Sequence, residues 1–171
     1  MSKISKRIII FTAIIYIIVN VIFTIHIFSD NIKYGMKSGG YYYQVNIQNN
    51  IGERTTNKWD IAISNIEGKR DIIENENNSA QLNEFGSIVE NISTNRVFIF
   101  YLGVFLILLL ILISTSIIDI RLISKNELRK FELLDAILII VSIFISIRIL
   151  SAVLDLNTSL RDAVLYYNLI K

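Results

Sequence analysis

Apolar residues along the chain fall into three long blocks that are separated by polar segments. The blocks cover residues 8–28, 97–118 and 133–154, and each holds 21 or 22 residues. At a rise of about 1.5 Å per residue, each block would form a helix roughly 32 Å long, enough to cross the hydrocarbon core of a bilayer. None of the blocks carries the wide polar stripe with which a helix of a soluble protein meets water. The pattern predicts an all-α integral membrane protein with three transmembrane helices.

Basic residues predict how these helices are threaded. Segments 1–7 and 119–132 are short and rich in Lys and Arg, whereas segment 29–96 carries seven basic and nine acidic residues. Because basic residues are retained on the cytoplasmic side of a membrane, we expect 1–7 and 119–132 to be cytoplasmic. Segment 29–96 and the tail 155–171 are then extracytoplasmic. The basic residues of the two short segments are Lys3, Lys6, Arg7, Arg121, Lys125, Arg129 and Lys130.

Segment 29–96 is expected to form a small extracytoplasmic module, either α+β or helical. Residues 41–48 (YYYQVNIQ) alternate as a half-buried strand does, while residues 58–66 (KWDIAISNI) fit both a strand and a helical face. Residues 79–92 place apolar side chains at helical spacing, with Ser79 as the N-cap, and this helix can continue into the second apolar block. A segment this short buries only a marginal core, so we expect the module to lean on the membrane or on a partner.

The tail 155–171 has apolar residues on one side of a helical wheel and polar residues elsewhere. It fits an amphipathic helix that lies in the outer interface of the membrane, with Tyr166 and Tyr167 at the level of the headgroups. It fits as well a frayed helical end of the third span. The pattern alone leaves both readings open.

The amino-acid composition of the chain mainly excludes several kinds of catalytic and binding site. The chain has no Cys, one His and a formal net charge of +2. No disulfide or thiolate nucleophile is possible, a single His disfavours a conventional zinc site, and the charge offers no basic surface for nucleic acid. The hydrolase, metalloprotease and phosphate-loop motifs are missing as well. We therefore expect no enzyme, no cofactor and no bound metal. The 37 Ile and 16 Asn residues are typical of an AT-rich genome and favour a low-GC bacterium.

Polar residues inside the apolar blocks are the candidate functional positions. Arg148 lies in the third block, and a guanidinium there either reaches up to the headgroups or contacts another helix. The first block carries polar side chains every four residues, which place a polar row along one side of the helix. Such groups hydrogen-bond across helices in lipid. The candidate contacts are Asn20, Thr24, His26, Arg148 and Asp155.

These observations favour a protein that acts by binding in the plasma membrane, with its N-terminus cytoplasmic and its C-terminus extracytoplasmic. The expected function is that of an accessory, assembly or immunity-type subunit of a bacterial envelope complex. Its expected partners are the lipid bilayer and another membrane protein or a second copy of itself, and not nucleic acid. One alternative is an oligomeric transport or channel component, with a pore lined by Asn20, His26 and Arg148. A second alternative is a membrane sensor without its own output domain.

Overall fold

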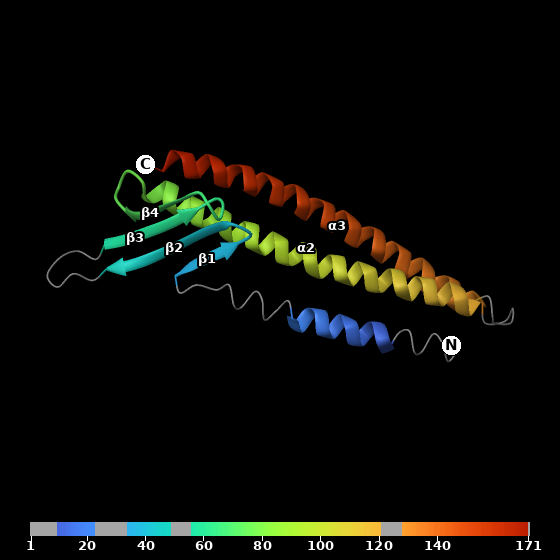
Figure 1. The fold of residues 1–171 in the computed structure, drawn as a ribbon. Helices are drawn as coiled ribbons and strands as arrows, with labels where there is room; N and C mark the ends of the chain where they lie inside the picture. The colour runs from blue at the N-terminus through green and yellow to red at the C-terminus, as the bar shows by residue number, and fades with distance from the viewer. Residues whose placement is uncertain (1–9, 23–33, 49–55, 121–127, 171) are drawn as a thin grey trace. The chain divides into compact units, whose positions relative to one another are not determined.

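A computed structural model gives the fold and describes residues 10–22, 34–48, 56–120 and 128–170 (Figure 1). The described chain is mostly helical, and its contacts divide it into two units. The helical unit draws on Met1–Ile25 and Phe98–Ala152, and the sheet unit draws on His26–Val97 and Val153–Lys171. The elements are the helix Ile10–Ile22, β1 (Gly35–Ser38), β2 (Tyr41–Gln48), β3 (Thr56–Ala62), β4 (Gly68–Ile73), α2 (Ser79–Ile120) and α3 (Leu128–Leu169).

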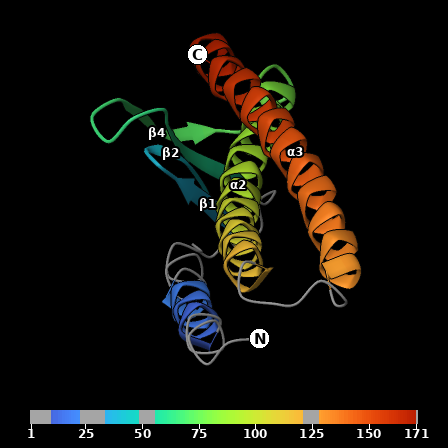
Figure 2. The same cartoon turned by 90° about the vertical axis from the view of Figure 1, so that its right-hand side faces the viewer.

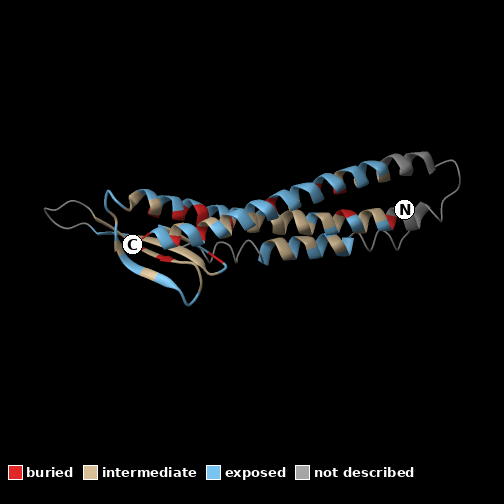
Figure 3. Cartoon of the chain, turned by 90° about the horizontal axis from the view of Figure 1, so that it is seen from above, coloured by how far each residue is buried: buried red, intermediate tan, exposed pale blue. Residues whose placement is uncertain are grey.

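The helical unit contains the apolar parts of α2 and α3. Their most apolar 18-residue windows have a mean hydropathy of 3.1 and 2.7, and only 6% and 17% of those windows is buried. Figure 3 shows how little of these stretches is buried. The core helix of a soluble protein would be mostly covered, and an exposed apolar surface of this extent is consistent with contact to lipid. The described residues therefore include two helices that are long and apolar enough to span a membrane.

The third predicted span, residues 8–28, is described over a shorter range. The structure shows an apolar helix at Ile10–Ile22, and the flanking residues of that block lie outside the described chain. An apolar helix is therefore present within the range expected for the first span.

The sheet unit is built on a four-stranded antiparallel sheet in the order β1-β2-β3-β4. The strand predicted at residues 41–48 is confirmed as β2, and residues 58–62, whose pattern fitted strand and helix, lie in β3. Strands β1 and β2 are joined by Gly39 and Gly40, whose φ angles are 55° and 95°. Positive φ at both central residues is what a two-residue type I′ hairpin turn requires, and Gly adopts it without steric cost.

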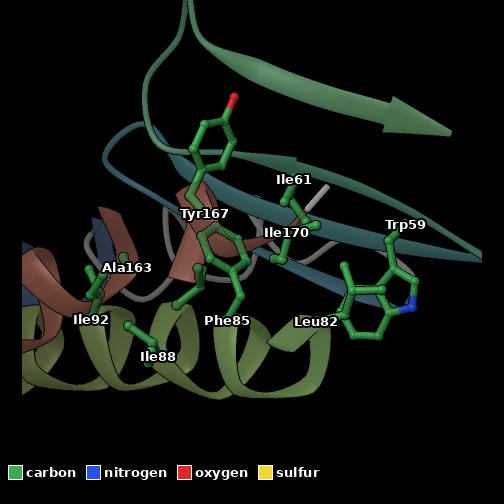
Figure 4. Close-up of a cluster of buried hydrophobic side chains, with 10 residues drawn as sticks. Trp59, Ile61, Leu82, Phe85, Ile88, Ile92, Ala163, Tyr167 and Ile170 are labelled. Atoms are coloured by element: carbon green, nitrogen blue, oxygen red, sulfur yellow. The ribbon is translucent and has the colours of Figure 1, made fainter. Parts of the chain in front are cut away.

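Two helix segments cover one face of this sheet (Figures 1 and 2). The first turns of α2 and the last turns of α3 supply side chains that meet those of β3 in one buried cluster, which Figure 4 shows at close range. Burying a Leu, Ile or Phe side chain is worth about 1.5–3 kcal/mol, so this cluster holds the unit together. Its members are Trp59, Ile61, Leu82, Phe85, Ile88, Val89, Ile92, Ala163, Tyr167 and Ile170.

The helix predicted at residues 79–92 is confirmed and runs on without a break into the second apolar block, as part of α2. The residue before it fills the cap position, because the carbonyl of Asn78 accepts the amide of Leu82 at 3.0 Å. Ser79 was expected as the cap and is the first helical residue instead. Asn78 was the better candidate because its side chain also bonds the preceding turn, accepting from the amide of Asn75 at 2.8 Å.

The tail folds against protein rather than against lipid alone. Helix α3 continues to Leu169, and the apolar side of its end packs into the core of the sheet unit. Tyr167, which was expected at the level of the headgroups in one of the two readings, is only 4% exposed because it packs into this core. The apolar face of an amphipathic helix indicates contact with an apolar surface, and that surface can be protein as well as lipid. The module thus leans on the tail of its own chain.

Candidate functional site

The sheet unit has a second face, opposite the core, that carries polar and charged side chains. Side chains alternate between the two faces of a strand. Because Tyr43 and Ile61 lie directly opposite each other on the core side, their neighbours Tyr42 and Asp60 project to the other side. Lys37 pairs with Tyr42 across β1 and β2 and lies on that side too. We call this surface the polar face of the sheet.

A hollow of about 540 Å³ lies on this face. It collects side chains from all four strands and from the loop that joins β3 to β4. Its volume falls in the usual range for binding sites, but its lining carries charges of both signs where small-molecule sites are mostly apolar. The side chains that define this polar-face hollow are Lys37, Tyr42, Asp60, Ser64, Glu67 and Arg70.

A β-bulge shapes the floor of the hollow. The pairing of β3 with β4 shifts between Trp59 and Ile61, and Asp71, opposite this shift, has a φ of 56°. The amide of Asp71 donates to Oδ1 of Asp60 at 2.8 Å, which fixes that carboxylate. Bulges insert a residue and re-aim its neighbours, and Asp tolerates the left-handed region better than most residues. The irregularity sets Arg70 beside Asp60 on the polar face.

Tyr42 is the aromatic centre of the hollow. Its hydroxyl donates to Oε1 of Gln44 at 2.6 Å. Burial raises the pKa of Tyr42, the charge of Asp60 raises it further, and Arg70 opposes both. The phenol therefore keeps its proton at neutral pH and can act as a hydrogen-bond donor or acceptor for a ligand. The arrangement offers recognition chemistry, because three cations (Lys37, Lys69 and Arg70), two carboxylates and a phenol line one concave surface.

The loop between β3 and β4 is held in a defined conformation at the rim of the hollow. The hydroxyl oxygen of Ser64 accepts the amides of Ile66 at 3.3 Å and of Glu67 at 2.9 Å. The amide of Ile63 also donates to the carbonyl of Glu67 at 3.2 Å. These bonds form a local turn of the type that Ser favours. Ile66 is left 99% exposed at its tip.

The residues singled out from the sequence lie elsewhere. Asn20 donates from Nδ2 to the carbonyl of Tyr16 at 2.7 Å, so its amide bonds its own helix. Thr24 and His26 are outside the described residues. Arg148 and Asp155 are both exposed. Among the described residues the structure records no hydrogen bond or ion pair that joins any two of these candidates.

Helices α2 and α3 also border a groove within the helical unit. It has a volume of about 550 Å³ and is lined by apolar side chains together with Ser142 and Ser146. Both hydroxyls bond their own helix, Ser142 to the carbonyl of Leu138 at 2.8 Å and Ser146 to that of Ser142 at 2.9 Å. The polar groups of the groove are therefore satisfied within α3, and Arg148 is not part of its lining. This groove supplies no polar path along the helices.

The polar-face hollow was not found from the sequence. Its walls come from β1 and β4, which were not predicted as strands, and its residues lie up to 33 positions apart. One signal pointed to it. The pair Gly39–Gly40 directly before the alternating strand 41–48 is a strong hairpin indicator and places Lys37 opposite Tyr42.

Comparison of this chain with protein-family models, with curated proteins and with solved structures gave no match.

Proposed function

We propose that this chain is a non-enzymatic membrane protein that acts by binding another protein through the polar-face hollow of its extracytoplasmic sheet unit. In this role it is an accessory, assembly or immunity-type subunit of an envelope complex in a low-GC bacterium. The long helices anchor the sheet unit to the plasma membrane, and the sheet unit carries the recognition surface.

The proposed threading has three spans. The helix Ile10–Ile22 belongs to the first span, and the apolar stretches of α2 and α3 form the second and third. The basic residues of segments 1–7 and 119–132 favour a cytoplasmic location for both, which leaves the sheet unit outside. The start of α2 and the end of α3 share the core of the sheet unit, so in this threading both ends must lie on the same side of the membrane.

The hollow itself is the observation that carries the proposal. Lys37 and Arg70 line it, and neither forms an ion pair with a residue that the structure describes. Cationic groups on a concave surface favour an oppositely charged partner and steer its approach. Charges of both signs on the lining favour a protein surface, which offers both signs in return, over a simple anion.

Charge reversal tests this proposal. The tagged full-length chain is expressed in its native host, solubilised and recovered, and co-recovered proteins are quantified. Lys37→Glu and Arg70→Glu should each lower recovery of a stoichiometric partner by at least about tenfold, which corresponds to the loss of one close charge pair. The amount of the chain itself should not change.

Lys58→Glu provides the matched control, because Lys58 is a half-buried lysine of β3 that does not line the hollow. Equal losses from Lys37→Glu and Lys58→Glu would show that overall charge, and not the hollow, governs partner binding. Unchanged recovery from both hollow variants would refute the proposed site.

A further inference from the structure

One apolar side chain of the sheet unit is almost fully exposed to solvent. Ile66 is 99% exposed, whereas every other exposed large hydrophobic residue of the described chain is at most 66% exposed. It stands at the tip of the turn that Ser64 fixes, so its exposure is built into the loop. Covering this side chain with an apolar partner would remove its apolar surface from water, which is favourable.

The position of this loop within the sheet unit identifies the partner. The hairpin turn at Gly39 and Gly40 lies beside the loop, because a Cβ built on Gly40 would be 3.5 Å from the Cα of Ser64. The same turn contacts α2 at Arg96, whose Nη1 donates to Oγ of Ser38 at 3.4 Å. A Cβ built on Gly39 would overlap the Arg96 guanidinium. The loop therefore lies at the end of the sheet unit where α2 carries Arg96.

Arg96 marks the start of the apolar stretch of α2. It is the last charged residue before residues 97–118, a stretch without a single Asp, Glu, Lys or Arg. In a helix that crosses a bilayer, Arg at such a boundary lies at the level of the headgroups. In the proposed topology, side chains at the Arg96 end of the sheet unit would be the nearest to the lipid surface, because Arg96 directly precedes the apolar stretch of α2.

We propose that the loop Ser64–Glu67 docks the sheet unit onto the outer leaflet, with Ile66 inserted among the headgroups. Apolar side chains at such contacts enter to a depth of about 5–10 Å. The insertion places the polar-face hollow next to the membrane surface, where a membrane-anchored partner would reach it. This inference rests on the proposed topology, in which α2 crosses the bilayer, and not on the identity of the partner.

The chain has no native Cys, so single cysteines report cleanly. Full-length variants Ile66→Cys, Asn77→Cys and Leu110→Cys are labelled with an environment-sensitive fluorophore and reconstituted into vesicles of phosphatidylglycerol and phosphatidylethanolamine. Asn77 is the matched control, since it is an exposed turn residue of the sheet unit just before the start of α2. Leu110 is 51% exposed in the apolar part of α2 and reports whether that helix is in lipid. The quencher is a nitroxide attached near the carbonyl end of the lipid acyl chain.

The Ile66→Cys label should shift to the blue and lose most of its emission to the lipid quencher, as the Leu110→Cys label does, while the Asn77→Cys label keeps its emission. Quenching at Leu110 with an Ile66 signal equal to that at Asn77 would overturn the docking and leave the topology intact. No quenching at Leu110 would overturn the topology and the docking together. Partner recovery by the charge-reversal variants is measured separately, so failure of the hollow as a binding site is distinguishable from both results.

Discussion

The side chain of Lys69 in β4 holds the end of α3, because its ammonium donates to the main-chain oxygen of Tyr167 at 2.7 Å and to that of Ile170. The same ammonium lies 4.5 Å from the centroid of the Tyr167 ring. The last turn of α3 has no basic residue of its own. Lys69 therefore supplies from the sheet the positive charge that the carbonyl end of a helix attracts.

Replacing this ammonium should loosen the tail. Lys69→Met keeps the length of the side chain but leaves the carbonyls without their donor, and we expect the free energy of unfolding of the sheet unit to fall by about 1–2 kcal/mol. Fluorescence of the single tryptophan, Trp59, in the buried cluster reports the transition in detergent. Lys37→Met is the control, since Lys37 is exposed and should leave stability nearly unchanged. Equal effects of the two substitutions would contradict this role of Lys69.

The tail should be required for the module to fold. A fragment of residues 29–96 lacks Ala163, Tyr167 and Ile170, which close the core from the side of α3. We expect no cooperative thermal transition for this fragment by circular dichroism, because so small a core is marginal even when complete. Joining residues 153–171 to the fragment through a flexible linker should restore the transition. A cooperative transition without the tail would show that the sheet and α2 suffice.

The sequence anticipates the parts of this fold that local pattern determines. Unbroken apolar runs predict the long helices, and alternation predicts β2. The sequence pattern does not predict strands β1 and β4, because GMKS and GKRDII alternate only weakly between apolar and polar residues. These segments become strands through pairing with their neighbours. The burial of Tyr167 in the sheet unit could not be predicted for a different reason. An amphipathic helix has the same sequence pattern whether lipid or a sheet covers its apolar face. The hollow needs both missing strands and a bulge, and no local pattern encodes their combination.

The hairpin at Gly39 should tolerate no side chain. Gly39→Ala places a Cβ at a φ of 55° and against the Arg96 guanidinium, so we expect a loss of about 1–2 kcal/mol in the free energy of unfolding. Gly103 is the matched control, because a Cβ built there meets nothing within 4 Å. Gly103→Ala lies inside α2 and should be neutral or stabilising by up to about 1 kcal/mol. Thermal unfolding in detergent measures both, and a stable Gly39→Ala variant would contradict the assigned turn.

Stability should decline in alkaline solution because of Tyr43. Its hydroxyl donates to Oε1 of Glu90, and burial first, then the bond and the charge of Glu90, raise the pKa of Tyr43 well above its ordinary value of 10.0. The unfolded chain therefore loses this proton at a lower pH than the folded chain does. The contribution is complete below pH 10 and is lost as the pH rises from there toward the folded pKa. Tyr43→Phe should flatten the fall in unfolding free energy above pH 10, and an unchanged slope would contradict this origin.

The central claim is that the sheet unit lies outside the membrane. In the sequence, its two segments precede and follow the apolar stretches of α2 and α3. Single cysteines at Asn77 and Thr158, two exposed positions of that unit, and one at Ser124 in the basic segment between α2 and α3 are treated on intact cells with an impermeant thiol reagent. Asn77→Cys and Thr158→Cys should both be labelled, and Ser124→Cys should be labelled only after the cells are opened. Labelling of Ser124→Cys on intact cells, with the other two protected, would invert the threading. Labelling of only one of Asn77→Cys and Thr158→Cys would contradict the shared unit itself.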